Sequence, residues 1–229
     1  MKRDDSDYIG HRQRLRERFL KSLGNDMADY EALEMLLTYA LPRKDVKPLA
    51  KQLIKKFGSF AKVVSAPINL LMTIAGIKEN TATMIKFVEF AAKKLSWQNL
   101  AYDDAPIIST KDVLLEFCRC SMAYSDVEEL RIIYVDAKLR VIGTEILQRG
   151  SVSSVNIHHR EVIVKALERN AVGVIMVHNH PSGDPRPSSN DIEATKRVKK
   201  ACEAADIMLY EHIIITPTSY FSFAEHALL

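Results

Sequence analysis

The chain has 229 residues, of which 47% are hydrophobic, enough for one large domain or two small ones. No apolar run approaches the length of a membrane span, and the charged start does not resemble a signal peptide, so we expect a cytoplasmic protein without membrane contact. The three cysteines are odd in number and lack a zinc-knuckle spacing, which indicates ordinary thiols in a reducing compartment.

The formal net charge of +3 conceals an asymmetry. Residues 1–95 contain 18 lysines and arginines against 11 aspartates and glutamates, a net charge of +7, whereas the remainder contains 14 against 18, a net charge of −4. A basic half is the part of a chain that would contact a polyanion such as DNA.

A helix predicted within residues 1–25 carries much of this positive charge. Arg12, Arg14 and Arg16 recur along it, while Leu15 and Phe19, four residues apart, give it one apolar edge. The arginines are consistent with a solvated helical face and equally with a surface that contacts phosphate.

The remainder of the basic half is predicted to be helical, with helices near residues 29–41 and 45–57. Residues 70–88 then resemble a helix-hairpin-helix, whose turn commonly has glycines on both sides of a hydrophobic residue and exposes backbone N–H groups to a phosphate. Gly76 fits this pattern, but Lys78 stands where the second glycine is expected. Structural packing and DNA contact through the lysine charge both remain open. We expect an all-α, helix-hairpin-helix-like domain over residues 1–95.

The second half of the chain alternates between helical and strand patterns. Residues 96–109 lack periodicity and contain a proline, so we interpret them as a linker. Strands that alternate with helices around a central apolar strand predict an α/β sandwich with a mixed sheet over residues 110–229. The predicted helices are residues 110–120, 158–170 and 189–205, and the predicted strands are residues 131–135, 141–148, 171–177 and 207–217, with a possible short strand after them.

The end of the apolar strand carries the most distinctive group of polar residues. His178 and His180 are two apart, and alternate side chains of an extended strand share a face, so both imidazoles can point at one atom. A proline-rich loop follows, Ser188 or Ser189 can cap the next helix, and Asp191 falls in its first turn. Two imidazoles and a carboxylate leave a tetrahedral Zn²⁺ one open position, as in catalytic zinc sites, although related ligand sets hold other metals.

A zinc hydrolase also needs a carboxylate that lies near the attacking water and does not bind the metal. Three upstream glutamates compete for this role. Glu145 lies on a predicted strand, and Glu161 and Glu168 lie on the helix that follows it.

The spacing H-x-H-x7-S-x2-D resembles the JAMM signature of MPN-domain metallopeptidases, and the segment HNHPSGDPRPSSND is similar to the RadC family in particular. The order of the N-terminal segments is also similar to that of RadC proteins, so the resemblance covers nearly the full chain. It implies an MPN fold, one Zn²⁺ per chain held by His178, His180 and Asp191, and a Ser188 hydroxyl that stabilises an oxyanion. It also favours Glu145, which is followed by Gly150-Ser151, over Glu161 as general base and acid.

Three functions compete at this stage. The first is zinc-dependent hydrolysis of a peptide or isopeptide bond, with an uncertain link to DNA repair or processing. The second is a metal-dependent nuclease, to which the basic half, through Arg12, Arg14, Arg16, Gly76 and Lys78, would deliver DNA. The third is a non-catalytic DNA-binding protein with a relict zinc site. The sequence does not distinguish the substrate or the oligomeric state.

Overall fold

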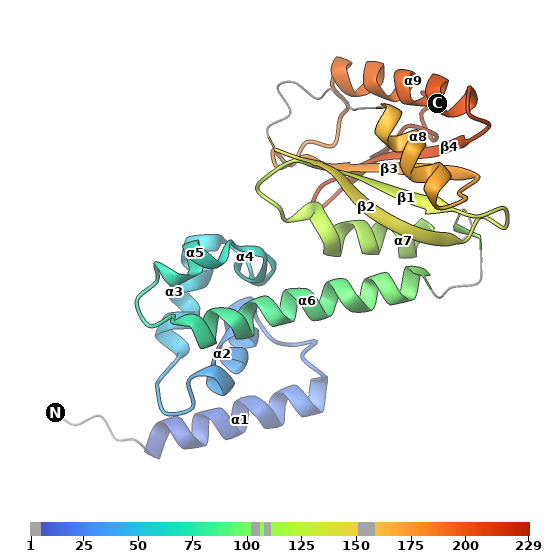
Figure 1. Cartoon of the computed structure of the whole chain (residues 1–229). Helices are drawn as coiled ribbons and strands as arrows, with labels where there is room; N and C mark the ends of the chain where they lie inside the picture. The colour runs from blue at the N-terminus through green and yellow to red at the C-terminus, as the bar shows by residue number, and fades with distance from the viewer. Residues whose placement is uncertain (1–5, 102–105, 108–110, 151–158) are drawn as a thin grey trace. The chain divides into compact units, whose positions relative to one another are not determined.

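The computed structural model of the chain describes residues 6–101, 106–107, 111–150 and 159–229 (Figure 1). It divides into two units, Met1–Ala91 and Ala92–Leu229. The first is helical and the second combines helices with a mixed sheet, which confirms the predicted fold class. Among the helices of the described residues, none has a continuous apolar stretch that could span a lipid bilayer.

The first unit consists of short helices packed on a shared apolar core. Leu33 and Leu37 of α2, Leu53 of α3 and Ile85 of α6 are fully buried in that core. The spacing of four residues between Leu33 and Leu37 places both on the inner face of α2. The helices are α1 (Ser6–Ser22), α2 (Asp29–Ala40), α3 (Lys47–Phe57), α4 (Phe60–Ser65), α5 (Ile68–Met72) and the part of α6 (Glu79–Ala101) up to Ala91.

A tight turn joins α5 to α6 where the sequence resembles a helix-hairpin-helix. Gly76 has φ 95°, a conformation that favours glycine, and Ile77 beside it is buried. Lys78 does not adopt a positive φ, and its carbonyl accepts a hydrogen bond from the Ala82 N–H (2.9 Å). The turn therefore needs one glycine, and a lysine at the second position causes no backbone strain.

The second unit is built on a five-stranded sheet with the strand order β2-β1-β3-β4-β5. β3 and β4 are parallel and the other neighbouring pairs are antiparallel, so the sheet is mixed as predicted. The strands are β1 (Glu129–Val135), β2 (Val141–Arg149), β3 (Gly173–Asn179), β4 (Met208–Ile215) and β5 (Tyr220–Ser222). The helices are α7 (Lys111–Cys118), continued by a π-helical turn (Arg119–Ala123), α8 (His159–Glu168) and α9 (Ser189–Glu203).

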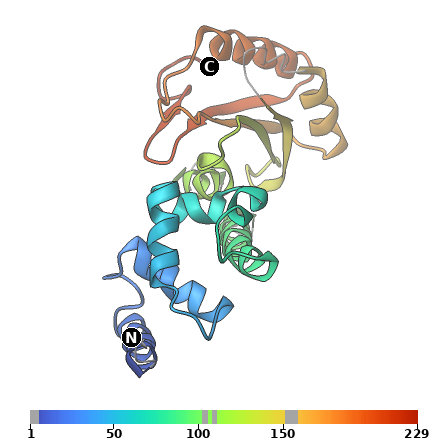
Figure 2. The same ribbon diagram turned by 90° about the vertical axis from the view of Figure 1, so that its left-hand side faces the viewer.

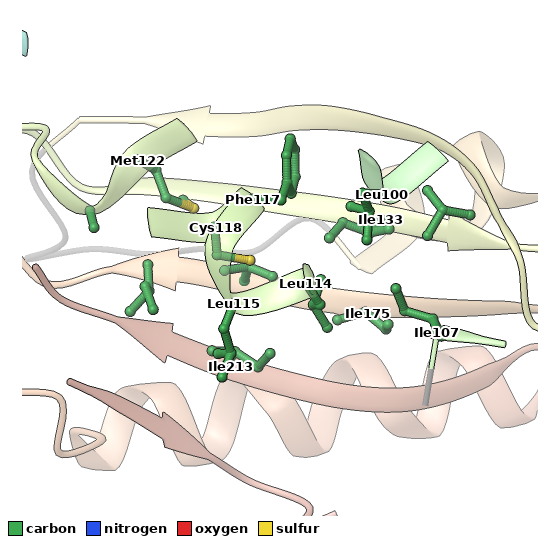
Figure 3. Packing of buried hydrophobic residues seen from close by; sticks show 14 of the residues in the cluster. Leu100, Ile107, Leu114, Leu115, Phe117, Cys118, Met122, Ile133, Ile175 and Ile213 are labelled. Atoms are coloured by element: carbon green, nitrogen blue, oxygen red, sulfur yellow. The ribbon is translucent and has the colours of Figure 1, made fainter. Parts of the chain in front are cut away.

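Helices cover both faces of this sheet. α8 and α9 lie on one face and α7 lies on the other, as both views show (Figures 1 and 2). Because side chains alternate along a strand, Ile133 and Ile175 pack with α7 (Figure 3), whereas Ile132 and Met176 pack with α8 and α9. Burial on both faces explains why β3 is a continuous apolar run.

The boundary between the units differs from the predicted linker at residues 96–109. Residues 96–101 continue α6, because Trp97 packs against Phe117 with ring centroids 5.5 Å apart and Leu100 is buried in the cluster that includes Leu114. These apolar side chains recur at helical spacing, so the segment is helical and packs against the core of the second unit. Residues 102–105 and 108–109 of the predicted linker lie outside the described residues.

Candidate metal centre

The two histidines of the motif lie at the end of β3, between β1 and β4. His178 pairs with Leu130 of β1 and with Ile214 of β4, so the centre of the sheet supports it. Asp191 lies in the first turn of α9. One ligand atom from each of His178, His180 and Asp191 lies within 4.8 Å of the other two. The structure therefore brings together the three residues predicted as metal ligands.

The distances within the cluster fit one small cation. The two Nε2 atoms of His178 and His180 are 3.0 Å apart, and oxygens of Asp191 lie 3.4 Å and 3.7 Å from them. A tetrahedral zinc with bonds of about 2.0–2.1 Å separates its ligands by about 3.3 Å. The donor set of two nitrogens and one carboxylate also suits zinc, although the distances alone do not distinguish zinc from a similar divalent ion.

The state of the His180 ring supports the same conclusion. Its Nδ1 is 2.7 Å from the carbonyl oxygen of Asp184, and a carbonyl can only accept, so this nitrogen donates. In the neutral ring, Nε2 then carries a lone pair directed at the cluster. Nε2 of His178 faces this lone pair at 3.0 Å. Two lone pairs at this separation repel one another unless a proton or a metal ion lies between them.

The start of α9 fixes the carboxylate of Asp191. Ser188 is the N-cap, and its Oγ accepts the Asp191 N–H (3.2 Å). In return, Asp191 Oδ2 accepts the Ser188 N–H (2.7 Å) and the Ser188 hydroxyl (2.6 Å). This capping box satisfies two N–H groups at the helix start and orients the ligand.

Electrostatics favour an ionised Asp191 and a neutral His178, which are the metal-binding forms of these two groups, whereas a metal ion would compete with a proton at His180. Burial raises the pKa of Asp191, but the hydrogen bonds to His180 and Ser188 and the electrostatic interaction with His178, which is protonated only in acid, lower it by more, so this pKa is below its usual range. Burial lowers the pKa of His178 to about 4, so this imidazole is neutral at pH 7. The hydrogen bond to Asp191 raises the pKa of His180.

A cavity of about 680 Å³ opens beside the cluster and contains a glutamate that the sequence analysis did not consider. Glu128 is partly buried, and its Oε2 has no hydrogen-bond partner among the described residues. Burial raises the pKa of Glu128, and the charge of Asp191 raises it further, against an opposing effect of His180. The cavity is lined by Asp126, Val127, Glu128, Gly150, His180, Pro181, Ser182, Ser188, Asn190 and Asp191.

Strand register explains why Glu128 reaches this cavity. Leu130 on β1 pairs with His178 on β3, and Glu128 lies two residues before Leu130. Because side chains two residues apart in an extended chain point to the same face, Glu128 lies on the same face of the sheet as His178. Asn179 holds the segment in place: its Oδ1 accepts the Glu129 N–H (2.8 Å), and its Nδ2 donates to the Val127 carbonyl (3.1 Å). The sequence predicts both strands but not their register, so this glutamate was missed.

The structure does not bring Glu145 to the metal ligands. Its carboxylate accepts a hydrogen bond from Arg169 (2.8 Å) and lies 3.6 Å from the Lys165 ammonium group, and Glu145 does not line the cavity. The other two glutamates, Glu161 and Glu168, are exposed on α8. The position of Glu145 therefore supports a structural ion pair between β2 and α8.

The predicted nucleic-acid residues all lie in the first unit, where the structure separates their roles. The Arg12 guanidinium donates to the carbonyls of Leu41 (3.2 Å), Pro42 and Lys44, so it binds the chain just after α2. Arg14 and Arg16 are exposed on α1, and Gly76 and Lys78 are exposed in the turn before α6. Their contact with a nucleic acid stays a prediction.

The sandwich and its cluster define an α/β domain with a candidate metal centre at the end of the central strand. Comparisons with known proteins identify a domain of the same kind. The family model described as "RadC-like JAB domain" matches residues 108–228. The chain is 42% identical to a UPF0758 protein of Ruegeria pomeroyi over 213 residues, 93% of this chain and 94% of the relative. It is 41% identical to a UPF0758 protein of Rhodobacter capsulatus over 215 residues, 94% of this chain and all of the relative.

The chain therefore belongs to the RadC family, as its motif predicted. A JAB domain with a His-His-Asp cluster indicates a metal-dependent hydrolase of the JAMM type.

Proposed function

We propose that this protein is a zinc-dependent hydrolase of peptide or isopeptide bonds, in which His178, His180 and Asp191 hold the ion and Glu128 transfers protons. The observation that carries the proposal is the carboxylate of Glu128, which lines the cavity of His180 and Asp191 and has one oxygen without a hydrogen-bond partner in the part of the chain that the structure describes. When bound, a zinc ion supplies Lewis acidity, which lowers the pKa of water and polarises a carbonyl.

Glu128 has the properties of a general base and acid. It lines the same cavity as His180 and Asp191 but does not belong to the candidate ligand group, so its carboxylate remains available to take a proton from water. Burial raises its pKa and thereby brings it closer to neutral pH, which favours return of that proton to the leaving nitrogen. We assign to Glu128 the role that the sequence favoured for Glu145.

Ser188 serves the site first by orienting Asp191. Its hydroxyl donates to Asp191 Oδ2 (2.6 Å), so it would have to turn away from this oxygen to donate to a substrate oxyanion. We retain the oxyanion role that the family resemblance implies, as a second role for the same hydroxyl.

The charge of the cavity favours an amide over a phosphodiester. Asp126, Glu128 and Asp191 line it, and no lysine or arginine does so in the described ranges. Residues 151–158, which follow the lining residue Gly150, also contain no lysine or arginine. A phosphodiester backbone brings one negative charge per nucleotide and would be repelled by these carboxylates. We therefore rank the nuclease below the amide hydrolase, and we expect any link to DNA repair to depend on contacts made by the first unit.

The first experiment is elemental analysis of wild-type protein and of the His178→Ala/His180→Ala variant, both purified without added metal. We expect about one zinc per wild-type chain and none in the variant. A panel of fluorogenic peptides and lysine-linked isopeptides, with supercoiled DNA in parallel, then defines the substrate class, and Glu128→Gln is the inactive control.

Amide cleavage that requires both zinc and Glu128 would support the proposal. Fully loaded protein that cleaves no amide in the panel but nicks DNA in a manner dependent on Glu128 would instead establish the nuclease. Loaded protein that cleaves nothing would favour the non-catalytic alternative.

A further inference from the structure

A chain of three buried hydrogen bonds begins behind the ring of His178. Its Nδ1 lies 2.8 Å from Nε2 of His212 on β4. The other nitrogen of His212, Nδ1, lies 2.6 Å from Oγ1 of Thr195 on α9. The Thr195 hydroxyl in turn donates to the main-chain carbonyl of Asp191 (2.6 Å). The chain therefore connects β3, β4 and α9 behind the candidate metal centre.

The last bond fixes the direction of the others. A main-chain carbonyl can only accept a hydrogen bond, so the Thr195 hydroxyl donates its single proton to the Asp191 carbonyl. The hydroxyl oxygen can then only accept a hydrogen bond from His212. His212 must then donate through Nδ1, which leaves Nε2 of its neutral ring as an acceptor. His178 must consequently donate through Nδ1, and its own Nε2 carries the lone pair that faces the cluster. The carbonyl of Asp191 thus determines which nitrogen of His178 is free to bind a metal.

We propose that Thr195 and His212 are positioning residues that hold His178 in the tautomer with an unprotonated Nε2 directed at the metal centre. The inference rests on the proposed metal site and extends it to residues that do not touch the ion. Metal-binding histidines in proteins commonly depend on a hydrogen bond to their second nitrogen for orientation and basicity. Here that partner is a second imidazole, whose own orientation needs the hydroxyl of Thr195.

The surroundings leave His212 and Thr195 little freedom. Both are about 1% exposed, and the His212 ring stacks on Phe223 with centroids 4.4 Å apart and planes 20° apart. In the parallel register His212 lies beside Met176, two residues before His178. Thr195 lies one helical turn after Asp191, so the same residue provides a ligand carboxylate and the carbonyl at the far end of the chain. Because these groups are buried, water cannot readily replace a missing partner.

The test uses variants that remove one hydrogen bond while they preserve shape. Thr195→Val replaces the hydroxyl by a methyl group, so neither tautomer of His212 is favoured any longer, whereas Thr195→Ser keeps the hydroxyl. His212→Phe removes the acceptor of His178 altogether. Thr216→Val is the matched control, because Thr216 is also fully buried in the second unit but its hydroxyl contacts Ser219.

The first measurement is Zn²⁺ affinity in competition with a chromophoric chelator. We expect Thr195→Val and His212→Phe to weaken zinc binding about 10–100-fold, the usual effect of removing such a partner. Thr195→Ser and Thr216→Val should bind zinc nearly as wild type does. Wild-type affinity in folded Thr195→Val would overturn the proposal.

The second measurement is the tautomeric state of ¹⁵N-labelled histidines by NMR in the full chain without metal. We expect an unprotonated Nε2 on His178 in wild type and in Thr195→Ser, and a mixture of tautomers in Thr195→Val. An unchanged His178 tautomer in Thr195→Val would also overturn the proposal. This result does not require zinc binding or hydrolysis, so failure of the hydrogen-bond chain is distinguishable from failure of the proposed function.

Discussion

Glu128 and His180 line the same cavity because Leu130, two residues further along β1, pairs with His178 on β3. The proposed proton-transfer group and the candidate metal ligands are therefore placed by adjacent antiparallel strands, and a shift of one residue in this register would direct Glu128 to the opposite face. The activity of the site should depend on this strand pair more than on the nearby β2.

Glu128→Gln and Glu145→Gln should have opposite consequences. We expect Glu128→Gln to lower kcat/KM about 10²–10⁴-fold while zinc content stays at the wild-type level, because the change removes a proton acceptor and leaves the ligands intact. Glu145→Gln should retain activity and lose at most about 1 kcal/mol of stability, since it weakens a partly exposed ion pair with Arg169 and Lys165. Kinetics and denaturant unfolding of both variants provide the test. An inactive, well-folded Glu145→Gln with normal zinc content would restore Glu145 to the catalytic role.

Asn179→Ala should separate activity from metal binding. The side chain makes hydrogen bonds to Glu129 and Val127, so its loss frees the segment that carries Glu128 and costs about 1–3 kcal/mol of stability. We expect kcat/KM to fall at least tenfold while the zinc affinity changes little, because His178 remains on β3 and the main chain of His180 stays bonded to Ile215 of β4. Steady-state kinetics and chelator competition measure the two quantities. Equal losses of zinc affinity and activity would show that Asn179 acts mainly on the metal ligands.

Zinc should stabilise the second unit by mass action. At a free concentration 100 times the Kd, a ligand specific for the folded state adds about 2.7 kcal/mol to the free energy of unfolding. We expect the thermal transition of that unit to rise with added Zn²⁺ and to return to its starting temperature with a chelator, as measured by calorimetry. The His178→Ala/His180→Ala variant should show no such shift. A similar rise in this variant would place the stabilising zinc elsewhere.

Arg12 and Arg16 should behave differently if the first unit binds nucleic acid. Arg16→Ala should weaken binding to DNA and reduce the salt dependence of log Kd by about one ion, as expected for loss of a single phosphate contact. Arg12→Ala should instead destabilise the unit, because its guanidinium binds carbonyls after α2. Fluorescence titrations at several salt concentrations and denaturant unfolding distinguish these effects. DNA affinity that is unchanged in an Arg14→Ala/Arg16→Ala variant would exclude this face of α1.

The ion pair between Arg18 and Glu31 should make the docking of α1 sensitive to acid. The hydrogen bond from Arg18 lowers the pKa of Glu31 below its ordinary value of 4.5, so the stabilisation is present above pH 4.5 and is lost as the pH falls through the folded-state pKa. Because the pair is partly exposed, we expect Glu31→Gln to cost at most about 1 kcal/mol at pH 7. Unfolding of both proteins from pH 7 to pH 3 should show the difference shrink. If the difference in unfolding free energy between wild type and Glu31→Gln stayed constant with pH, the loss of stability would instead come from packing.

The sequence was most informative where the relevant residues are local. His178 lies on β3, His180 directly follows this strand and Asp191 follows within one loop, so their spacing and the motif that it resembles predicted that their side chains would meet. The helix cap at Ser188 was predictable for the same reason. The α/β sandwich followed from the alternation of apolar runs and helical patterns.

The sequence was least informative where the outcome depends on which distant segments pair. Glu145 lies on the correct face of the sheet, opposite Ile132, but Arg169, just after α8, binds its carboxylate. The position of Glu128 beside the candidate metal ligands depends on the register between β1 and β3. Residues 96–101 resemble a linker in the sequence, but in the structure they are helical because Trp97 packs against Phe117. Each of these features depends on tertiary packing, which local periodicity does not encode.

The capping box at Ser188 and Asp191 has a consequence for the dynamics of α9. Asp191 Oδ2 receives the N-terminal hydrogen bonds of this helix, while the same carboxylate belongs to the candidate metal cluster. Fraying of the first turn would therefore dismantle the metal centre, and an occupied centre would suppress fraying. Amide exchange at the start of α9 should therefore report metal occupancy. Helix ends are ordinarily among the most mobile parts of a domain, but with metal bound this one should be among the slowest to open.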